Sequence, residues 1–212
     1  MTDLSFDADC RLCPRLAGFL DEVRADYPDY HARPVAPFGA PNPDLLVVGL
    51  APGMHGANAS GRPFTGDFAG ILLYKTLFEF GFSSSPASTS STDGLKLHGC
   101  RITNAVKCLP PQNKPLPVEI KVCNTYLKNE MARLKKGAVI LALGTIAHAA
   151  VLRALELKAS AYPFGHGNQH TLPDERWLID SYHCSRYNTQ TRRLTEDMFR
   201  AVFELARRRI NA

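Results

Sequence analysis

The stretch LLVVGLA at residues 45–51 is almost entirely apolar and runs directly into a proline and a glycine. A second stretch of the same character, AVILAL, occupies residues 138–143. Short, continuous apolar runs followed by turn residues are typical of strands buried on both faces of a parallel sheet. RITNAV at residues 101–106 and WLIDSY at residues 177–182 have strand length and similar endings, so four strands are predicted.

Segments with a helical spacing of apolar residues separate the predicted strands. They cover Gly70–Phe80, Pro117–Leu134, Thr145–Leu155 and Arg192–Arg209. This alternation predicts an α/β fold with a parallel sheet and helices on both of its faces. No repeat or linker interrupts the pattern, so residues 1–212 are predicted to form one domain. A polar, mobile loop is expected at residues 83–94, and the segment before residue 45 is expected to wrap one edge of the sheet.

The composition excludes several classes of protein. The 212 residues are 45% hydrophobic and 21% charged, which is ordinary for a globular domain. No run approaches the roughly 20 apolar residues of a membrane span, and the first ten residues, MTDLSFDADC, lack the apolar centre of a signal peptide. Residence in the cytoplasm, without membrane attachment, is the expectation. The net charge of +5 permits a polyanionic partner without demonstrating one.

Six cysteines in a reducing compartment favour metal binding or catalysis over disulfides. Cys10 and Cys13, in CRLCP, have the two-residue gap that lets two thiolates reach one metal centre. A second pair, Cys108 and Cys123, is fifteen positions apart across a proline-rich segment. This wider spacing fits a bulky iron–sulfur cluster better than a single zinc ion, and unrelated buried thiols are the alternative interpretation.

The segment GLAPGMHGANASGRPFTGD at residues 49–67 contains five glycines and two prolines in nineteen residues. Such a loop lets backbone approach a ligand closely, but it lacks the glycine spacing of a Walker or Rossmann motif. Phe64 either packs beneath this loop or stacks on a flat ligand. Asp67 is most simply the N-cap of the helix that follows, and it is also the only carboxylate in the loop.

Polar side chains also follow two other predicted strands. The amide of Asn104 can either bond the adjoining turn or read the edge of a pyrimidine through two hydrogen bonds. His183, with Ser185 close behind, can donate a hydrogen bond to a developing anion. Neighbours in an extended chain point to opposite faces, so Cys184 is not expected to act together with His183. Three cations beside this group form either a solvated surface or a site for phosphates: Arg186, Arg192 and Arg193.

Together these segments resemble the family 5 (B-type) uracil-DNA glycosylases. The resemblance rests on GLAPGMHGANASGRPFTGD, ITNAVKCLPPQNKP and HCSRYNTQTRRL, in that order, with CRLCP near the start. It implies a three-layer α/β/α fold with a small central parallel sheet, and a 4Fe–4S cluster held by Cys10, Cys13, Cys108 and Cys123. It also implies excision of uracil, hypoxanthine, xanthine or ethenocytosine from DNA. The family's second motif usually reads His-Pro-Ser, and Cys184 replaces the proline here, which should make the loop less stiff.

The resemblance further implies a mechanism in which the damaged nucleotide is flipped into a pocket. Phe64 would stack on the base, Asn104 would bond its Watson–Crick edge, and His183 would stabilise the departing base anion. Leu50 stands where related enzymes carry an acidic residue, which leaves His55, Asn58 and Asp67 as the polar candidates for orienting the attacking water. Asp67 is favoured for this role because it is the only carboxylate in the loop. Further substrate contacts are expected from the same motifs, at Gly53, His55, Asn58 and Ser185.

Damaged DNA, in single or double strands, is the expected partner of a monomeric enzyme. Two other classes of function remain open at this point. One is a non-catalytic iron–sulfur or zinc module that binds DNA, which the apolar Leu50 favours, and the other is a hydrolase of small nucleotides. The first predicts DNA binding without cleavage, and the second predicts activity on free nucleosides.

Overall fold

The computed structural model describes residues 6–212 and contains a six-stranded sheet in the order β1-β3-β2-β4-β6-β5. The four central strands are parallel, and the two edge strands run antiparallel to their neighbours. β2 and β4 are buried along their whole length, as their continuous apolar sequences predict. The strands are β1 (Phe38–Gly39), β2 (Leu45–Gly49), β3 (Cys100–Asn104), β4 (Val139–Leu143), β5 (Gln169–Thr171) and β6 (Trp177–Ser181).

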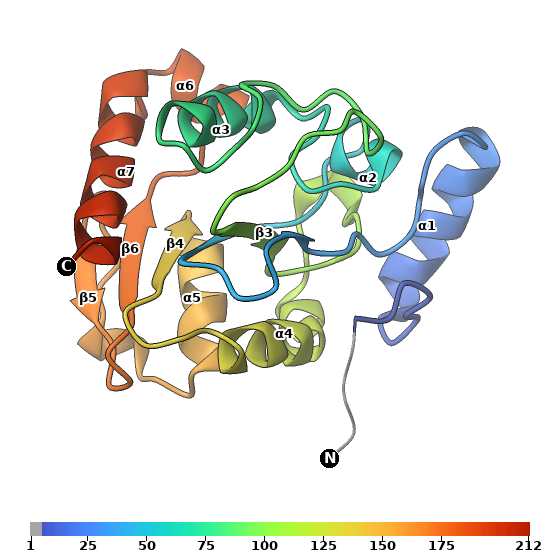
Figure 1. Cartoon of the computed structure of the whole chain (residues 1–212). Coiled ribbons are helices and arrows are strands. Elements are labelled where there is room, and N and C mark those ends of the chain that lie inside the picture. Colours follow the sequence, from blue (N-terminus) through green and yellow to red (C-terminus); the bar gives the residue numbers. More distant parts are fainter. Residues whose placement is uncertain (1–5) are drawn as a thin grey trace.

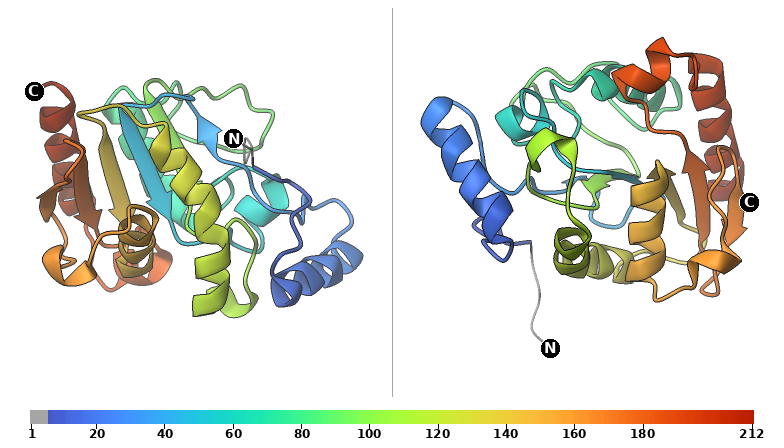
Figure 2. Two further views of the ribbon diagram at one scale, coloured as in Figure 1. Left: turned by 90° about the horizontal axis from the view of Figure 1, so that it is seen from below. Right: turned by 180° about the vertical axis from the view of Figure 1, so that it is seen from behind.

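Helices cover both faces of the sheet, which confirms the predicted α/β class in three layers (Figures 1 and 2). α3 (Phe68–Glu79) and α7 (Glu196–Ile210) pack on one face together with Leu45 and Val47 of β2. α4 (Pro117–Ala132) and α5 (Thr145–Ala154) pack on the other face with the alternate residues Leu46 and Val48. Successive residues of β2 thus serve two separate cores, because side chains alternate between the faces of a strand.

The sheet differs from the prediction at its edges, because β1 and β5 make it mixed rather than purely parallel. Both strands are only two or three residues long, which is too short for periodicity to give a signal. β1 belongs to the segment before residue 45, which lies along one edge of the sheet as expected.

Three helices and two single turns were not predicted: α1 (Pro14–Asp26), α2 (Ala57–Ser60), α6 (Arg186–Gln190), η1 (Pro111–Asn113) and η2 (Ala159–Ala161). α1 lies apart from both helical layers, at one end of the molecule (Figure 1). The last helix begins at Glu196 rather than at the predicted Arg192, because Arg192 has a left-handed backbone with φ +56°. Thr195 is its N-cap and accepts a hydrogen bond from the Met198 amide.

The polar segment at residues 83–94 is anchored rather than free. Arg62 and Asp93 form a buried ion pair of 2.6 Å, and Arg62 also donates to Ser88. Burial by itself would raise the pKa of Asp93, but the Arg62 hydrogen bond and three backbone N–H groups outweigh it and hold that pKa well below its usual range. The segment therefore braces the glycine-rich loop that contains Arg62.

None of the helices in the described part of the chain has the length and apolar character needed to span a membrane. The expectation that the chain begins without a signal peptide concerns a stretch whose first residues, 1–5, lie outside the described part.

Candidate active site

Three of the four parallel strands end at one pocket of about 450 Å³. It lies at the carboxyl edge of the sheet, where open α/β sheets bind their ligands. β2 leads into Leu50 and Ala51, β3 ends at Asn104, and β6 is followed by His183. The lining residues are Leu50, Ala51, Gly53, Phe64, Asp67, Phe68, Ala69, Asn104, Asn113, His183, Ser185, Arg186 and Tyr187.

Phe64 is held in the pocket wall by its neighbours in sequence. Its backbone is left-handed, with φ +61°, which is uncommon for a residue that carries a Cβ. Tyr74 donates a hydrogen bond to the carbonyl of Pro63 (2.8 Å), and the hydroxyl of Thr65 pairs with that of Ser88 (2.7 Å). The flanking residues thus fix a strained backbone, a feature that clusters at binding sites.

Glycines make room for the Phe64 segment. A Cβ on Gly70 would lie 1.8 Å from the Phe64 carbonyl oxygen, so α3 can approach this backbone only because residue 70 is glycine. The Phe64 ring lies almost parallel to the imidazole of His183, with an interplanar angle of 24° and centroids 6.1 Å apart. A flat ligand in the pocket can therefore contact both rings.

Asn104 carries an unsatisfied acceptor. Its side chain is only 3% exposed, and its amide oxygen has no hydrogen-bond partner within residues 6–212. A buried polar atom without a partner is costly unless a ligand satisfies it. A Cβ on Gly49 would lie 2.4 Å from this oxygen and 2.6 Å from the Phe64 ring, so a larger residue there would push on both.

Asp67 is the N-cap of α3 by its position, but its side chain makes no cap hydrogen bond to that helix. Its Oδ2 instead accepts from the amide of Ala57 (3.1 Å), at the start of α2. A Cβ on Gly53 or Gly56 would come within 2.1 Å of Asp67 Oδ1, so the carboxylate rests against bare backbone. Burial raises the pKa of Asp67, and the amides of Ala57 and Gly53 oppose that shift.

His183 is neutral in this structure at physiological pH, because burial lowers its pKa to about 4. A neutral imidazole still carries one N–H that can donate a hydrogen bond into the pocket. Its backbone carbonyl accepts from the side chain of Asn188 (2.8 Å). Ser185 lines the pocket and its hydroxyl caps α6 by accepting from the Asn188 amide. Asn188 therefore braces the loop in which Cys184 replaces the usual proline.

Cys184 itself faces away from the pocket. It is fully buried in the core beneath α3 and α7, and burial raises the pKa of its thiol to about 12. It does not line the pocket beside His183, in keeping with the opposite orientation of neighbours in an extended chain.

Two predicted contact residues lie outside the pocket lining. His55 is exposed and its Nδ1 pairs with the Tyr30 hydroxyl at 2.9 Å. Asn58 is fully buried in α2, and its amide nitrogen donates weakly to the Met54 carbonyl at 3.4 Å. Both residues belong to the glycine-rich segment at or beside α2, and each has a protein partner in place of a contact with the pocket lining.

The prediction also missed four residues of the lining: Phe68, Ala69, Asn113 and Tyr187. Phe68 and Ala69 directly follow Asp67 and form the first turn of α3. The predicted helix began at Gly70, so these two residues were not considered as part of the pocket wall. Asn113 has a left-handed backbone, with φ +56°, in the proline-rich segment after Cys108. The Arg186 guanidinium stacks on the Phe68 ring at 4.9 Å, which brings one of the three predicted cations to the pocket mouth.

The four predicted metal ligands line a second, narrow cavity: Cys10, Cys13, Cys108 and Cys123. Burial and the neighbouring sulfurs raise the pKa of Cys13 to about 11 and that of Cys108 to about 12. The Lys107 amide donates to Cys123 Sγ at 3.2 Å. Within residues 6–212, no three or more His, Cys, Asp or Glu side chains are arranged as ligands of a single metal ion.

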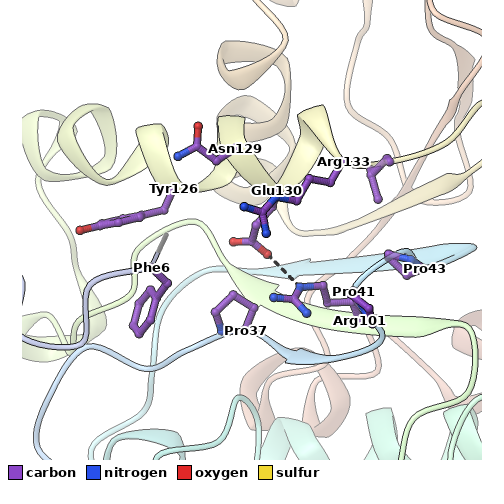
Figure 3. A pocket seen from close by; sticks show the side chains of 10 residues that line it. Phe6, Pro37, Pro41, Pro43, Arg101, Tyr126, Asn129, Glu130 and Arg133 are labelled. Carbon is purple, nitrogen blue, oxygen red and sulfur yellow. Dashed lines mark ion pairs between the residues drawn. The ribbon is translucent and has the colours of Figure 1, made fainter. Parts of the chain in front are cut away.

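A third pocket, of about 90 Å³, lies between β3 and α4, away from the predicted residues. Figure 3 shows Glu130 of α4 pointing across it towards Arg101 of β3, at an ion-pair distance of 3.6 Å. Glu130 also pairs with the buried Lys107 at 2.6 Å. Glu130 is thus engaged by two cations, and three prolines form part of the wall: Pro37, Pro41 and Pro43 (Figure 3).

Known proteins match this chain along most of its length. Residues 36–207 fit the family model described as the Uracil DNA glycosylase superfamily. A type-5 uracil-DNA glycosylase of Thermus thermophilus is 48% identical over 204 residues, which cover 94% of this chain and 93% of that protein. Type-5 enzymes of Mycobacterium bovis and Pyrobaculum aerophilum are 41% and 40% identical, over 94% and 93% of this chain and 77% and 87% of their own.

Proposed function

The chain belongs to the type-5 uracil-DNA glycosylases, and from that premise we propose that its pocket binds a uracil flipped out of DNA and hydrolyses the N-glycosidic bond. The observation that carries the assignment to this pocket is the unsatisfied amide of Asn104 beside two nearly parallel rings. An aromatic wall and a buried, unpaired amide suit a flat pyrimidine that presents both a donor and an acceptor.

Base recognition is assigned to Phe64 and Asn104. The ring of Phe64 would stack on the uracil, and its fixed backbone means that little entropy is lost when the base enters. The Asn104 amide would pair with the N3–H and O4 of uracil, which satisfies the buried oxygen that lacks a partner. Ser185 and the backbone at Gly53 complete the contacts that line the pocket.

Bond cleavage generates a sugar cation and a base anion, and His183 is assigned to the anion. Its lowered pKa keeps the imidazole neutral, so it stabilises the charge by donating a hydrogen bond rather than by transferring a proton. Because Phe64 and His183 are nearly parallel, the base stays close to the donor as the bond lengthens.

Water activation is assigned to Asp67. Related enzymes carry an acidic residue in the first motif. This residue has no counterpart here, because Leu50 and Ala51 line that part of the pocket. Asp67 is the only acidic side chain in the lining among residues 6–212, and its raised pKa is typical of a buried group that can accept a proton.

A 4Fe–4S cluster is assigned to Cys10, Cys13, Cys108 and Cys123. Burial, together with the neighbouring sulfurs, raises the pKa of the Cys13, Cys108 and Cys123 thiols, so these groups are poorly stable as thiolates unless a cationic centre neutralises them. The fifteen-residue spacing of Cys108 and Cys123 across a proline-rich segment favours a bulky cluster over a single zinc ion, and all four sulfurs line the same cavity. The cluster would stabilise the fold here rather than take part in hydrolysis.

The remaining assignments extend beyond uracil. Hypoxanthine, xanthine and ethenocytosine are proposed as further substrates, since stacking and anion stabilisation do not depend on one ring. Residues 1–212 are proposed to act as a single domain and as a monomer in the cytoplasm, on single- or double-stranded DNA. A non-catalytic DNA-binding module is not favoured, because the named relatives above are enzymes.

One assay tests the proposal directly. The protein is incubated with an oligonucleotide containing a single deoxyuridine, and alkali then cuts any abasic site. We expect cleavage at that position and none in a matched oligonucleotide with thymidine. Phe64→Ala and Asn104→Ala should each reduce cleavage at least tenfold, while the exposed Val118→Ala on α4 should not. Normal cleavage by both pocket variants would move the site elsewhere.

A further inference from the structure

A second groove of about 470 Å³ adjoins the substrate pocket, and Phe68 lines both. The groove runs between α3 on one side and the segment from α6 to the start of α7 on the other. Phe68, Ile71 and Lys75 all face it from α3. These positions follow helical spacing over two turns, so the groove extends about 10 Å from the pocket mouth.

The groove combines an apolar wall with cations. Ile71 is 66% exposed, which is unusual for a residue of its size, and the buried Leu194 forms part of the lining. Lys75 is paired with Glu196 at 2.6 Å, but Arg192 has no ion-pair partner among residues 6–212. Arg192 also has a left-handed backbone, with φ +56°, in the turn between α6 and α7.

We propose that this groove is a second nucleotide subsite, which binds the DNA nucleotide next to the flipped uracil. The inference rests on the proposed function of the adjoining pocket. An aromatic side chain beside cations is the chemistry that binds unpaired nucleotides, because a base stacks on the ring and phosphates pair with the cations. Phe68 supplies the ring here, and Ile71 extends the apolar contact area beside it. A base paired in a duplex cannot reach the ring, so the subsite acts on single strands.

The test is a double-mutant cycle between the enzyme and its substrate. Single-turnover excision is measured on an 11-nucleotide single strand with one central deoxyuridine. Its immediate neighbour on either side is replaced, one at a time, by a base-free tetrahydrofuran residue. On one of the two sides, we expect the spacer to raise the half-saturating enzyme concentration about tenfold with the parent. Ile71→Ala should raise it about fivefold on the normal strand and abolish the additional effect of the spacer.

Matched variants separate this contact from general effects. Phe78→Ala removes another exposed apolar side chain of α3 outside the groove. In this variant the spacer should still raise the half-saturating enzyme concentration about tenfold, as in the parent. Arg192→Ala should lower the slope of log affinity against log salt by about 0.7 on single strands, whereas Lys128→Ala on α4 should not. On a fully paired duplex, Ile71→Ala should match the parent.

The inference is wrong if spacer and Ile71→Ala act additively, if neither spacer has an effect, or if Ile71→Ala impairs duplex and single strand equally. A parent protein that cleaves no uracil-containing strand overturns the proposed function instead. Melting temperatures verify that each variant is folded, and alanine at exposed helix positions should not lower them.

Discussion

The substrate pocket and the cysteine cavity are joined by one short segment, residues 104–108. They differ in their polar groups, because the pocket holds an amide oxygen without a partner among residues 6–212 and the cavity holds several thiols close together. Asn104 at one end keeps an amide oxygen without a partner, and Cys108 at the other lies among three further thiols. Val106 between them donates to the Leu50 carbonyl at 2.9 Å, which ties the segment to the glycine-rich loop. In the proposed function, the pocket binds a base that is released after cleavage, whereas the cysteine cavity holds a cluster that stays bound. Substitutions in the cysteine cavity should therefore lower both the stability and the activity, while substitutions in the pocket should lower the activity alone.

Loss of a cluster ligand should have the largest effect. A protein that carries the proposed 4Fe–4S cluster should be brown. We expect Cys108→Ala or Cys123→Ala to remove this colour and to cost more than about 4 kcal/mol of unfolding free energy, because metal binding to such sites is largely folding energy. Cys100→Ala and Cys184→Ala delete equally buried thiols outside the cavity and should keep the colour, at a cost of about 1 kcal/mol. Iron and sulfide analysis of protein purified without oxygen, with thermal melts, measures both. Stoichiometric zinc, or colour that survives both ligand variants, would contradict the assignment.

His183→Ala should have the next largest effect, confined to chemistry. Removing one donor to a developing anion costs about 10²–10³ in rate in oxyanion holes, and we expect a single-turnover loss of that order. Colour and melting temperature should stay close to those of the parent, since His183 lines the pocket and is not among the described residues that line the cysteine cavity. Because its pKa is about 4, His183 should add no step to the pH–rate profile between pH 5 and 8. A step near pH 6.5 that disappears in His183→Ala would contradict this assignment.

Asp67→Asn should slow excision by about 10², at the lower end of the range for general base catalysis. A base must be ionised, so the rate of the parent should fall as the pH drops through the raised pKa of Asp67, and the variant should lack this fall. A raised folded-state pKa means that the ionised carboxylate destabilises the fold above that pKa. Asp67→Asn should therefore melt no lower than the parent at pH 7. A parent-like rate would leave Asp67 with only its structural contact to Ala57.

The same variant sharpens the comparison of substrates. Uracil forms the better leaving anion, so its excision should depend less on Asp67 than excision of hypoxanthine does. The ratio of the two rates, measured for parent and Asp67→Asn on otherwise identical oligonucleotides, should shift towards uracil in the variant.

The smallest effect is expected at the surface cations. Neutralising Arg186, Arg192 and Arg193 together should reduce the salt slope for undamaged duplex DNA by at most about 3. Arg186 and Arg193 stack on Phe68 and Tyr182, so the observed change is expected to be smaller than this limit. A titration of binding against salt concentration measures it. An unchanged slope would make the three cations ordinary solvated surface.

The sequence predicted an element most accurately where its local pattern has a single physical cause. β2 and β4 are buried on both faces, so they had to be continuously apolar, and their boundaries were predicted to within two residues. The order of the motifs identified the family, and the carboxyl ends of the strands marked the edge where Asn104 and His183 meet. Sheet edges gave no such signal, because β1 and β5 bury little and are held by pairing with neighbours distant in sequence.

Sequence by itself therefore determined the class of fold, the family and the residues from which the pocket is drawn. Only the tertiary structure decided how they are used. It paired His55 with Tyr30 and Asn58 with Met54 outside the pocket lining, directed the Asp67 carboxylate to Ala57 instead of α3, and opened a groove beside Phe68. The physical reason is that residue type and spacing fix what a side chain can do, whereas its neighbours across the fold fix which hydrogen bonds remain unmade. The buried amide of Asn104 is unsatisfied only because of what packs around it.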